Sequence, residues 1–138
     1  MLSKDLRVLV VEDDRLITLV MQTFLRMMGV PEERVGLAKN MVEAKSLIQL
    51  MQFDLIITAQ DVPGGSGIEI MELARELRPE IKLILVSGAR EEKLDYYASV
   101  VGKVGHFGRF QRPVMPEKLI CAFTEQGIEI SCPLPLAD

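Results

Sequence analysis

The sequence predicts an α/β fold in which a doubly wound, five-stranded parallel sheet carries helices on both faces. Short apolar runs, such as residues 8–11 and 54–58, alternate along the chain with longer amphipathic stretches. These short runs are rich in β-branched residues and show no polar face, as is typical of strands buried on both sides. Strands that alternate with helices pair in parallel through right-handed crossovers, so both faces of the sheet are covered.

We expect the five strands at residues 6–11, 35–38, 54–58, 82–87 and 107–110. The first helix is predicted to begin after Asp13 and Asp14, which offer side-chain acceptors and negative charge at a helix start. It should end at Gly29 and Pro31. Apolar residues at helical spacing place the other helices near 44–51, 70–77, 94–101 and from about 116. We expect the apolar residues of the fourth helix, of which Val101 is the last, to face the core.

Length and charge narrow the class of protein. The chain has 138 residues, of which 49% are hydrophobic, enough for one domain with a sizeable core. We assign residues 5–126 to this domain and 127–138 to a tail or linker. Sixteen basic residues against 20 acidic ones give a net charge of −4, which does not favour nucleic-acid binding. No apolar run is long enough to cross a bilayer, and charges come too early for a secretory signal. We therefore expect a cytoplasmic protein.

Functional residues in such a fold are expected beyond the carboxyl ends of the strands. The positions to inspect are Glu12, Asp13, Ala59, Ser87 and Arg112. The glycine-rich segment 64–67 lacks the Lys-Ser/Thr of a nucleotide-binding loop, so a turn is the better interpretation. The single histidine and the two cysteines are not spaced as a metal-ligating cluster.

The strand ends resemble those of the receiver domain of two-component response regulators, over roughly residues 5–126. An acidic cluster at 12–14 closes the first strand, and Pro63 and Gly67 follow the third strand in that family's D-x-x-M-P-x-x-x-G frame. Ser87 follows the fourth strand, and Arg112-Pro113 stands where the family has Lys-Pro. The resemblance implies a flavodoxin-like sheet in the order 2-1-3-4-5. It also implies a role in signal transduction or a phosphorelay rather than an enzyme.

Several positions depart from what the resemblance implies. The aspartate that accepts a phosphoryl group corresponds to Ala59, which has no nucleophile. The lysine that senses the phosphoryl charge corresponds to Arg112, and the aromatic switch residue to Arg109, which we expect to point outward. The hydroxyl of the switch corresponds to Ser87. The chain is therefore similar to a pseudo-receiver, a receiver fold without the usual phosphotransfer.

The acidic residues at the end of the first strand have two interpretations. By resemblance, Glu12 and Asp13 are metal ligands and Asp61 contributes through its backbone, but with Ala59 the site would hold Mg²⁺ weakly. The other interpretation is that Glu12 and Asp13 cap the first helix. We also expect Arg112 to bridge to Glu12 or Asp13 through two parallel hydrogen bonds, because an arginine can grip a carboxylate in this way.

Three functions follow from these observations. The first is a module without Asp phosphorylation that binds a protein through the face of the fourth helix, fifth strand and fifth helix. By resemblance the partner is a histidine kinase or an output domain, or a second copy in a homodimer. The second is a phosphorylatable regulator that uses Asp61 as a nonstandard acceptor, or in which Ala59 replaces an aspartate by engineering. The third is a metal or small-ligand sensor at the acidic cleft.

Overall fold

The computed structural model describes residues 1–88 and 94–131, with the backbone alone for 94–98. Its central sheet has five parallel strands in the order β2-β1-β3-β6-β7. They are β1 (Val8–Val11), β2 (Val35–Ala38), β3 (Leu55–Ala59), β6 (Lys82–Ser87) and β7 (Gly108–Gln111). Because β6 and β7 are the fourth and fifth strands of this sheet, the predicted order 2-1-3-4-5 is confirmed. A small antiparallel ribbon, β4 (Asp61–Val62) with β5 (Gly65–Ser66), follows β3.

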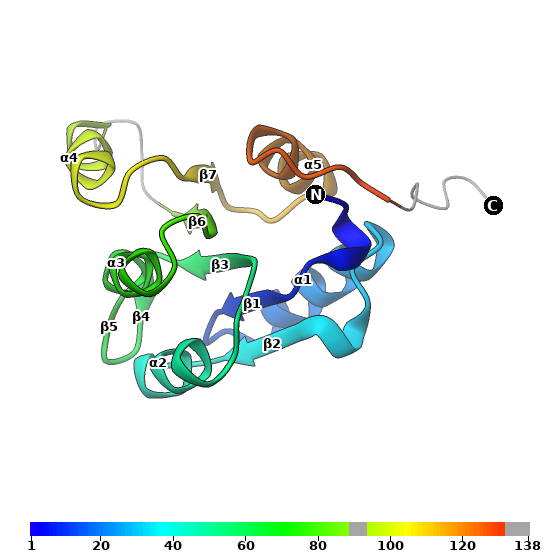
Figure 1. Ribbon diagram of the computed structural model, residues 1–138, viewed down its shortest axis with the longest axis horizontal. Helices are drawn as coiled ribbons and strands as arrows, with labels where there is room; N and C mark the ends of the chain where they lie inside the picture. The colour runs from blue at the N-terminus through cyan, green and yellow to red at the C-terminus, as the bar shows by residue number, and fades with distance from the viewer. Residues whose placement is uncertain (89–93, 132–138) are drawn as a thin grey trace.

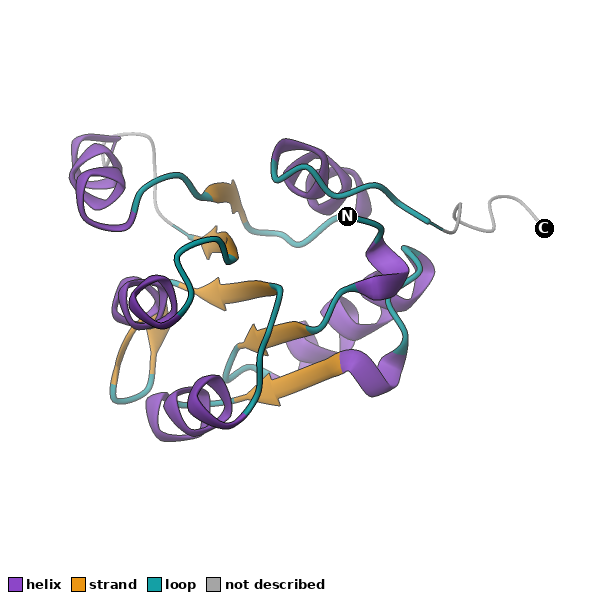
Figure 2. Ribbon diagram, in the orientation of Figure 1, coloured by secondary structure: helices purple, strands orange, loops and turns teal. Residues whose placement is uncertain are grey.

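Helices cover both faces of the sheet, as Figures 1 and 2 show. One face carries α1 (Arg15–Met27) and α5 (Pro116–Glu125). The other carries α2 (Met41–Leu50), α3 (Gly67–Leu77) and α4 (Leu94–Val104). Two short 3₁₀ helices, η1 (Ser3–Asp5) and η2 (Glu32–Arg34), precede β1 and β2.

The core consists of two apolar clusters, one on each face of the sheet. In β1, Leu9 and Val11 belong to the cluster under α2, α3 and α4, whereas Val8 and Val10 belong to the cluster under α1 and α5. Successive side chains of a strand point to opposite faces, so a strand between two helical layers must be apolar at every position. This requirement explains the uninterrupted apolar runs in the sequence.

Asp14, one of the two residues predicted at the start of the first helix, caps α1, and its carboxylate accepts hydrogen bonds from the backbone N–H groups of Leu16 and Ile17 at 2.9 and 3.2 Å. The other interpretation of the acidic pair, in which Glu12 and Asp13 cap this helix, is wrong. The prediction that Val101 of α4 faces the core is wrong, because Val101 is 48% exposed. Among the side chains described in α4, from residue 99 onwards, Val100 and Val104 are buried, four positions apart. Because Val100 and Val101 are adjacent valines, either of them could continue an apolar stripe at helical spacing. Packing against α3 and the sheet selects the stripe that contains Val100.

The chain segment after α5 packs against the N-terminal segment. Ile128 is buried, Ser3 N donates to the Glu129 carbonyl at 2.7 Å, and the Ser3 and Ser131 hydroxyls lie 2.9 Å apart. These contacts belong to the first part of the expected tail, and the boundary after residue 126 stays a prediction. Residues 132–138 lie outside the described residues. In the described part of the chain, no helix combines the length and apolar character needed to cross a bilayer.

Candidate functional site

The candidate site lies at the carboxyl edge of the sheet, where β1, β3, β6 and β7 end. Val11 of β1 pairs with Thr58 of β3, so Glu12 and Ala59 occupy neighbouring positions one residue further on. Ala59 is 3% exposed and is also paired with Val86 of β6. The position that the family resemblance equates with the acceptor therefore carries a buried methyl group, with no oxygen to attack phosphorus.

Glu12 is a buried carboxylate at the centre of this edge, with its side chain 5% exposed. Its Oε2 accepts the Asp14 backbone N–H at 3.0 Å, and its Oε1 accepts from Arg112. Burial raises the pKa of Glu12 above its ordinary value of 4.5, because desolvation disfavours the charged form. The hydrogen bond from Asp14 and the charge of Arg112 act in the opposite direction and offset part of this effect.

Arg112 follows β7 and reaches back across the sheet to β1. Its Nη2 donates to Glu12 Oε1 at 2.7 Å, and its side chain is 41% exposed. The predicted pairing with Glu12 is thus present, through one hydrogen bond instead of the two expected. Arg112 N also donates to the Ser87 carbonyl at 2.9 Å, which continues the pairing of β6 and β7 beyond the strand end. The Arg112-Pro113 peptide bond is cis.

Ser87 is fully buried, and its hydroxyl donates to Gln60 Oε1 at 3.0 Å. Gln60 N donates to the Val86 carbonyl at 3.2 Å, so this residue bridges the ends of β3 and β6 through both backbone and side chain. Sequence reasoning missed Gln60, although it directly follows Ala59 at a strand end, where polar side chains of a site are expected.

Asp13 and Asp61 are exposed and line one pocket of about 390 Å³. Gln60 and Arg112 also line this pocket, so the structure brings both aspartates to the edge that carries the other predicted residues. Asp61 belongs to β4 and pairs with Ser66 of β5. Its predicted role as a backbone ligand stays a prediction.

The residues at this edge do not fit the three-carboxylate Mg²⁺ site that the family resemblance implies. Ala59 removes one ligand, and Glu12 is already paired with Arg112. Across residues 1–88 and 94–131, no group of three or more His, Cys, Asp or Glu side chains is arranged to hold a metal ion. Mg²⁺ has hard oxygen ligands and dehydrates reluctantly, so a site with fewer carboxylates binds it less well.

Two further features concern the neighbouring elements. Arg109 on β7, which the resemblance equates with the aromatic switch, is half-buried rather than fully outward, and the adjacent Phe110 packs into the core under α1 and α5. An apolar pocket of about 460 Å³ lies between α1 and the loop after β7, with Leu16 on its rim. Leu16 is 70% exposed.

A doubly wound sheet with acidic residues, a hydroxyl and a basic residue at its carboxyl edge defines the class of receiver domains. The chain belongs to the response regulator receiver domain family, whose family model matches residues 8–124. Receiver domains are signalling modules of two-component systems.

Similar proteins agree with this assignment. The chain is 32% identical over 120 residues to the hydrogenase transcriptional regulatory protein HoxA of Cupriavidus necator, a match that covers 87% of this chain and 24% of that protein. It is 25% identical over 119 residues to the uncharacterized transcriptional regulatory protein YesN of Bacillus subtilis, covering 86% of this chain and 32% of YesN. The chain thus spans between a quarter and a third of the length of these curated relatives.

Solved structures show the same fold. A CheY-like receiver domain protein from Methanospirillum hungatei superposes with a TM-score of 0.74 at 27% identity, covering 87% of this chain and 91% of that one. A response regulator from Burkholderia pseudomallei, solved with a phosphorylated aspartic acid, a calcium ion and citrate, superposes with a TM-score of 0.74. It is 19% identical, and the match covers 89% of this chain and 69% of that one, which shows the fold alone.

Proposed function

We propose that this chain is a pseudo-receiver, a signalling module that acts by binding proteins without being phosphorylated on aspartate. The observation that carries the proposal is Ala59, a buried methyl group at the acceptor position. A methyl group cannot form an acyl phosphate, and the two aspartates that line the nearby pocket, Asp13 and Asp61, are not at this position.

The side-chain pairs around Ala59 support a single fixed state. Glu12 is held by Arg112 and Ser87 by Gln60, so both the acid and the hydroxyl of the site already have partners. A phosphoryl group would act by recruiting a hydroxyl and a cation to itself. Where internal partners hold these groups, the conformation of the β6 and β7 ends no longer depends on such a signal.

We place the protein interaction on the face formed by α4, β7 and α5, in the cytoplasm. The partner is a histidine kinase, an output domain or a second copy of the chain. The names of HoxA and YesN identify them as transcriptional regulatory proteins, and the match with this chain is confined to a minor part of each. In this proposal the receiver domain itself, residues 5–126, makes no contact with nucleic acid.

An amide ¹H–¹⁵N spectrum recorded with Mg²⁺, and then with Mg²⁺ and acetyl phosphate, tests the proposal. We expect the signals of Ser87 and Arg112 to stay in place under both conditions. Ala59→Asp is the matched variant in which they should move when the phosphodonor is added. Movement of both signals in the unmodified chain on adding acetyl phosphate would favour the phosphorylatable regulator. Movement around Glu12 and Asp13 with Mg²⁺ alone would favour the metal sensor.

A further inference from the structure

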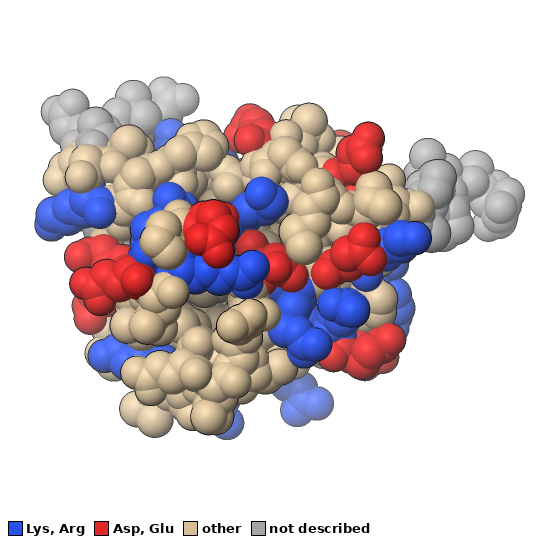
Figure 3. Space-filling model, in the orientation of Figure 1, with Lys and Arg blue, Asp and Glu red and all other residues tan. Residues whose placement is uncertain are grey.

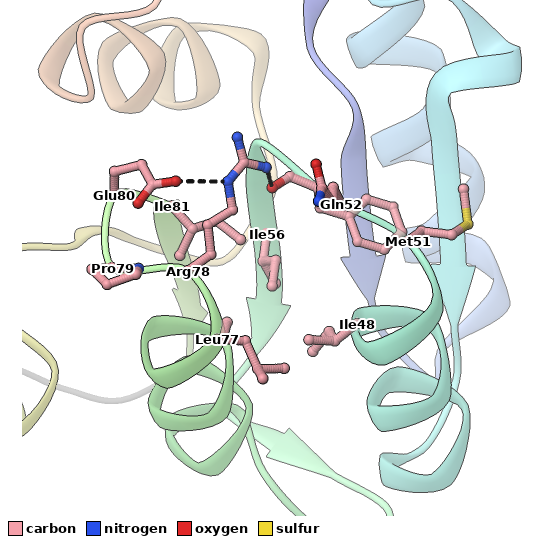
Figure 4. Close-up of a pocket in the computed structure, with 11 residues that line it drawn as sticks. Ile48, Met51, Gln52, Ile56, Leu77, Arg78, Pro79, Glu80 and Ile81 are labelled. Carbon is pink, nitrogen blue, oxygen red and sulfur yellow. Dashed lines mark hydrogen bonds and ion pairs between the residues drawn. The ribbon is translucent and has the colours of Figure 1, made fainter.

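Two adjoining hollows lie between α2 and α3, remote from Ala59. The first, of about 340 Å³, is shown in Figure 4. It lies at the amino edge of the sheet, because its lining residues Phe53 and Ile81 come two residues before β3 and one residue before β6. Ala59 ends β3 at the opposite edge. This hollow and the candidate site described above therefore lie at opposite edges of the sheet.

The first hollow opens to solvent and combines apolar side chains with a polar rim. Ile56 forms part of its floor, and Ile48 of α2 and Leu77 of α3 point towards each other across it (Figure 4). Leu77 is 56% exposed and Met51, on the same rim, is 36% exposed. Large apolar side chains exposed around a concave surface are typical of a site that another molecule covers.

The polar rim of this hollow is not an anion site. Arg78 Nη2 donates to Asp54 Oδ1 at 3.1 Å, Arg78 Nε donates to Glu80 Oε1 at 3.0 Å, and Arg78 Nη1 donates to the Phe53 carbonyl. Two carboxylates therefore surround the one guanidinium, and the local charge is negative. An acidic or anionic ligand would be repelled here.

The second hollow, of about 370 Å³, continues along the same two helices. Its α3 wall carries Glu69, Glu72 and Glu76, and its α2 wall carries Lys45. The spacing of three and four residues puts the three carboxylates on one side of α3. Among the described residues, Glu72 and Glu76 have no ion-pair partner. In Figure 3, acidic side chains gather at the position of α3.

We propose that this groove between α2 and α3 binds a basic amphipathic helix of a partner protein. An apolar side chain of that helix would enter the hollow between Ile48 and Leu77, and its Lys or Arg side chains would face Glu69, Glu72 and Glu76. Glu69 and Leu77 are eight residues apart on α3, or roughly 12 Å, the length of about two helical turns. Recognition of an amphipathic helix by an apolar groove with complementary charge is a common mode of peptide binding.

The charge pattern also argues against a second copy of this chain as the occupant. The chain carries a net charge of −4, so another copy would on average present acidic surface to an acidic groove. A basic partner removes this repulsion and leaves the apolar contact to stabilise the complex.

Fluorescence anisotropy with a labelled model peptide tests the proposal. The probe is a Leu/Lys peptide of about 18 residues, five helical turns, with leucines on one face. The charge control is the same peptide with Glu in place of Lys. We expect the Leu/Lys peptide to bind the full chain and the Leu/Glu peptide to fail. Binding should weaken as salt is raised, because the charges are exposed.

Two matched pairs of variants locate the binding site, and all of the replaced side chains are exposed, so the fold is retained. Glu72→Lys with Glu76→Lys should weaken binding about tenfold, whereas Glu32→Lys with Glu33→Lys, which makes the same change in net charge, should not. Leu77→Ser should weaken binding, and Leu16→Ser should leave it unchanged.

Three outcomes would overturn the proposal. The first is equal loss of affinity in each variant and its control, which would mean general attraction between a basic peptide and an acidic protein. The second is peptide-induced shifts in the amide spectrum that map to another face. The third is a monomer–dimer equilibrium in sedimentation that Leu77→Ser abolishes, which would make a second copy the occupant.

Discussion

The pairing of Glu12 with Arg112 is the contact on which the account of the site depends at the scale of single residues. Glu12 is almost fully buried, and a buried carboxylate is tolerated when charged or polar groups compensate it. Arg112 and the Asp14 N–H provide that compensation, each to a different oxygen of the carboxylate. Because Arg112 is 41% exposed, the pair is partly screened by solvent.

Replacing Arg112 with alanine should destabilise the chain by about 1–3 kcal/mol, because Glu12 keeps its burial and loses its cation. Urea unfolding at neutral pH measures this change. Lys39→Ala, which removes an exposed basic side chain, serves as the control and should change the free energy of unfolding by less than about 0.5 kcal/mol. Equal stability of Arg112→Ala and the parent would mean that the pair contributes nothing.

Replacing Glu12 with glutamine should change the dependence of stability on pH. The folded-state pKa of Glu12 is raised, so its protonated form favours folding. This contribution is complete below pH 4.5 and is lost as the pH rises through the raised pKa. Relative to the parent, Glu12→Gln should therefore gain stability as the pH rises above 4.5 and through the raised pKa. Unfolding curves across this range check the sign. If the parent became more stable than Glu12→Gln as the pH rises, the charge of Arg112 would outweigh the effect of burial on Glu12, and the pKa of Glu12 would be lowered.

At the scale of elements, the start of α3 is tightly constrained against the acceptor strand. A Cβ atom on Gly67 would collide with the carbonyl oxygen of Ala59, which is backbone and cannot move aside as a side chain could. Ser66, which caps α3, accepts the Glu69 backbone N–H through its hydroxyl. The turn at residues 63–67 therefore allows α3 to pack closely against β3.

Gly67→Ala should consequently destabilise the fold by about 1–3 kcal/mol or more through overpacking. Gly102→Ala is the matched control, because a Cβ there meets no atom within 4 Å and the residue lies inside α4. That substitution should stabilise by roughly 0.5–1 kcal/mol, since alanine is the better helix former. Thermal melting of both variants distinguishes them. A Gly67→Ala protein as stable as the parent would contradict the close contact.

Elements whose residues are buried on a regular pattern could be predicted from the sequence, and those set by tertiary contacts could not. β6 has the bounds that its apolar run predicts, because burial between two helical layers leaves little choice of residue. β2 also has the predicted bounds, although it is an edge strand in which only Ala38 is buried. The inward face of α4 was misassigned, since consecutive valines fit either of two registers. The pairing of residues 128–131 with the N-terminal segment had no signal in the sequence, because its hydrogen bonds join residues more than 120 positions apart.

At the scale of the whole molecule, the sheet topology brings the predicted residues to one edge. Glu12, Ala59, Ser87 and Arg112 come from four different strand ends, and the parallel order of those strands makes them neighbours. The sequence could predict this gathering, because every carboxyl end of a parallel sheet lies on the same side. It could not predict that Gln60 would hold Ser87, since the direction of a side chain after a strand end depends on the turn that follows.

The central claim is that this receiver domain does not accept a phosphoryl group, and intact mass after incubation with acetyl phosphate and Mg²⁺ tests it most directly. Ala59→Asp, which places a carboxylate at the proposed acceptor position, is the control and should gain one phosphoryl group slowly. Adding Arg112→Lys to it should speed the gain, because lysine is a compact cation that can leave Glu12. We predict that the unmodified chain keeps its mass unchanged. A single added phosphoryl group in that chain, mapped to Asp61, would contradict the account.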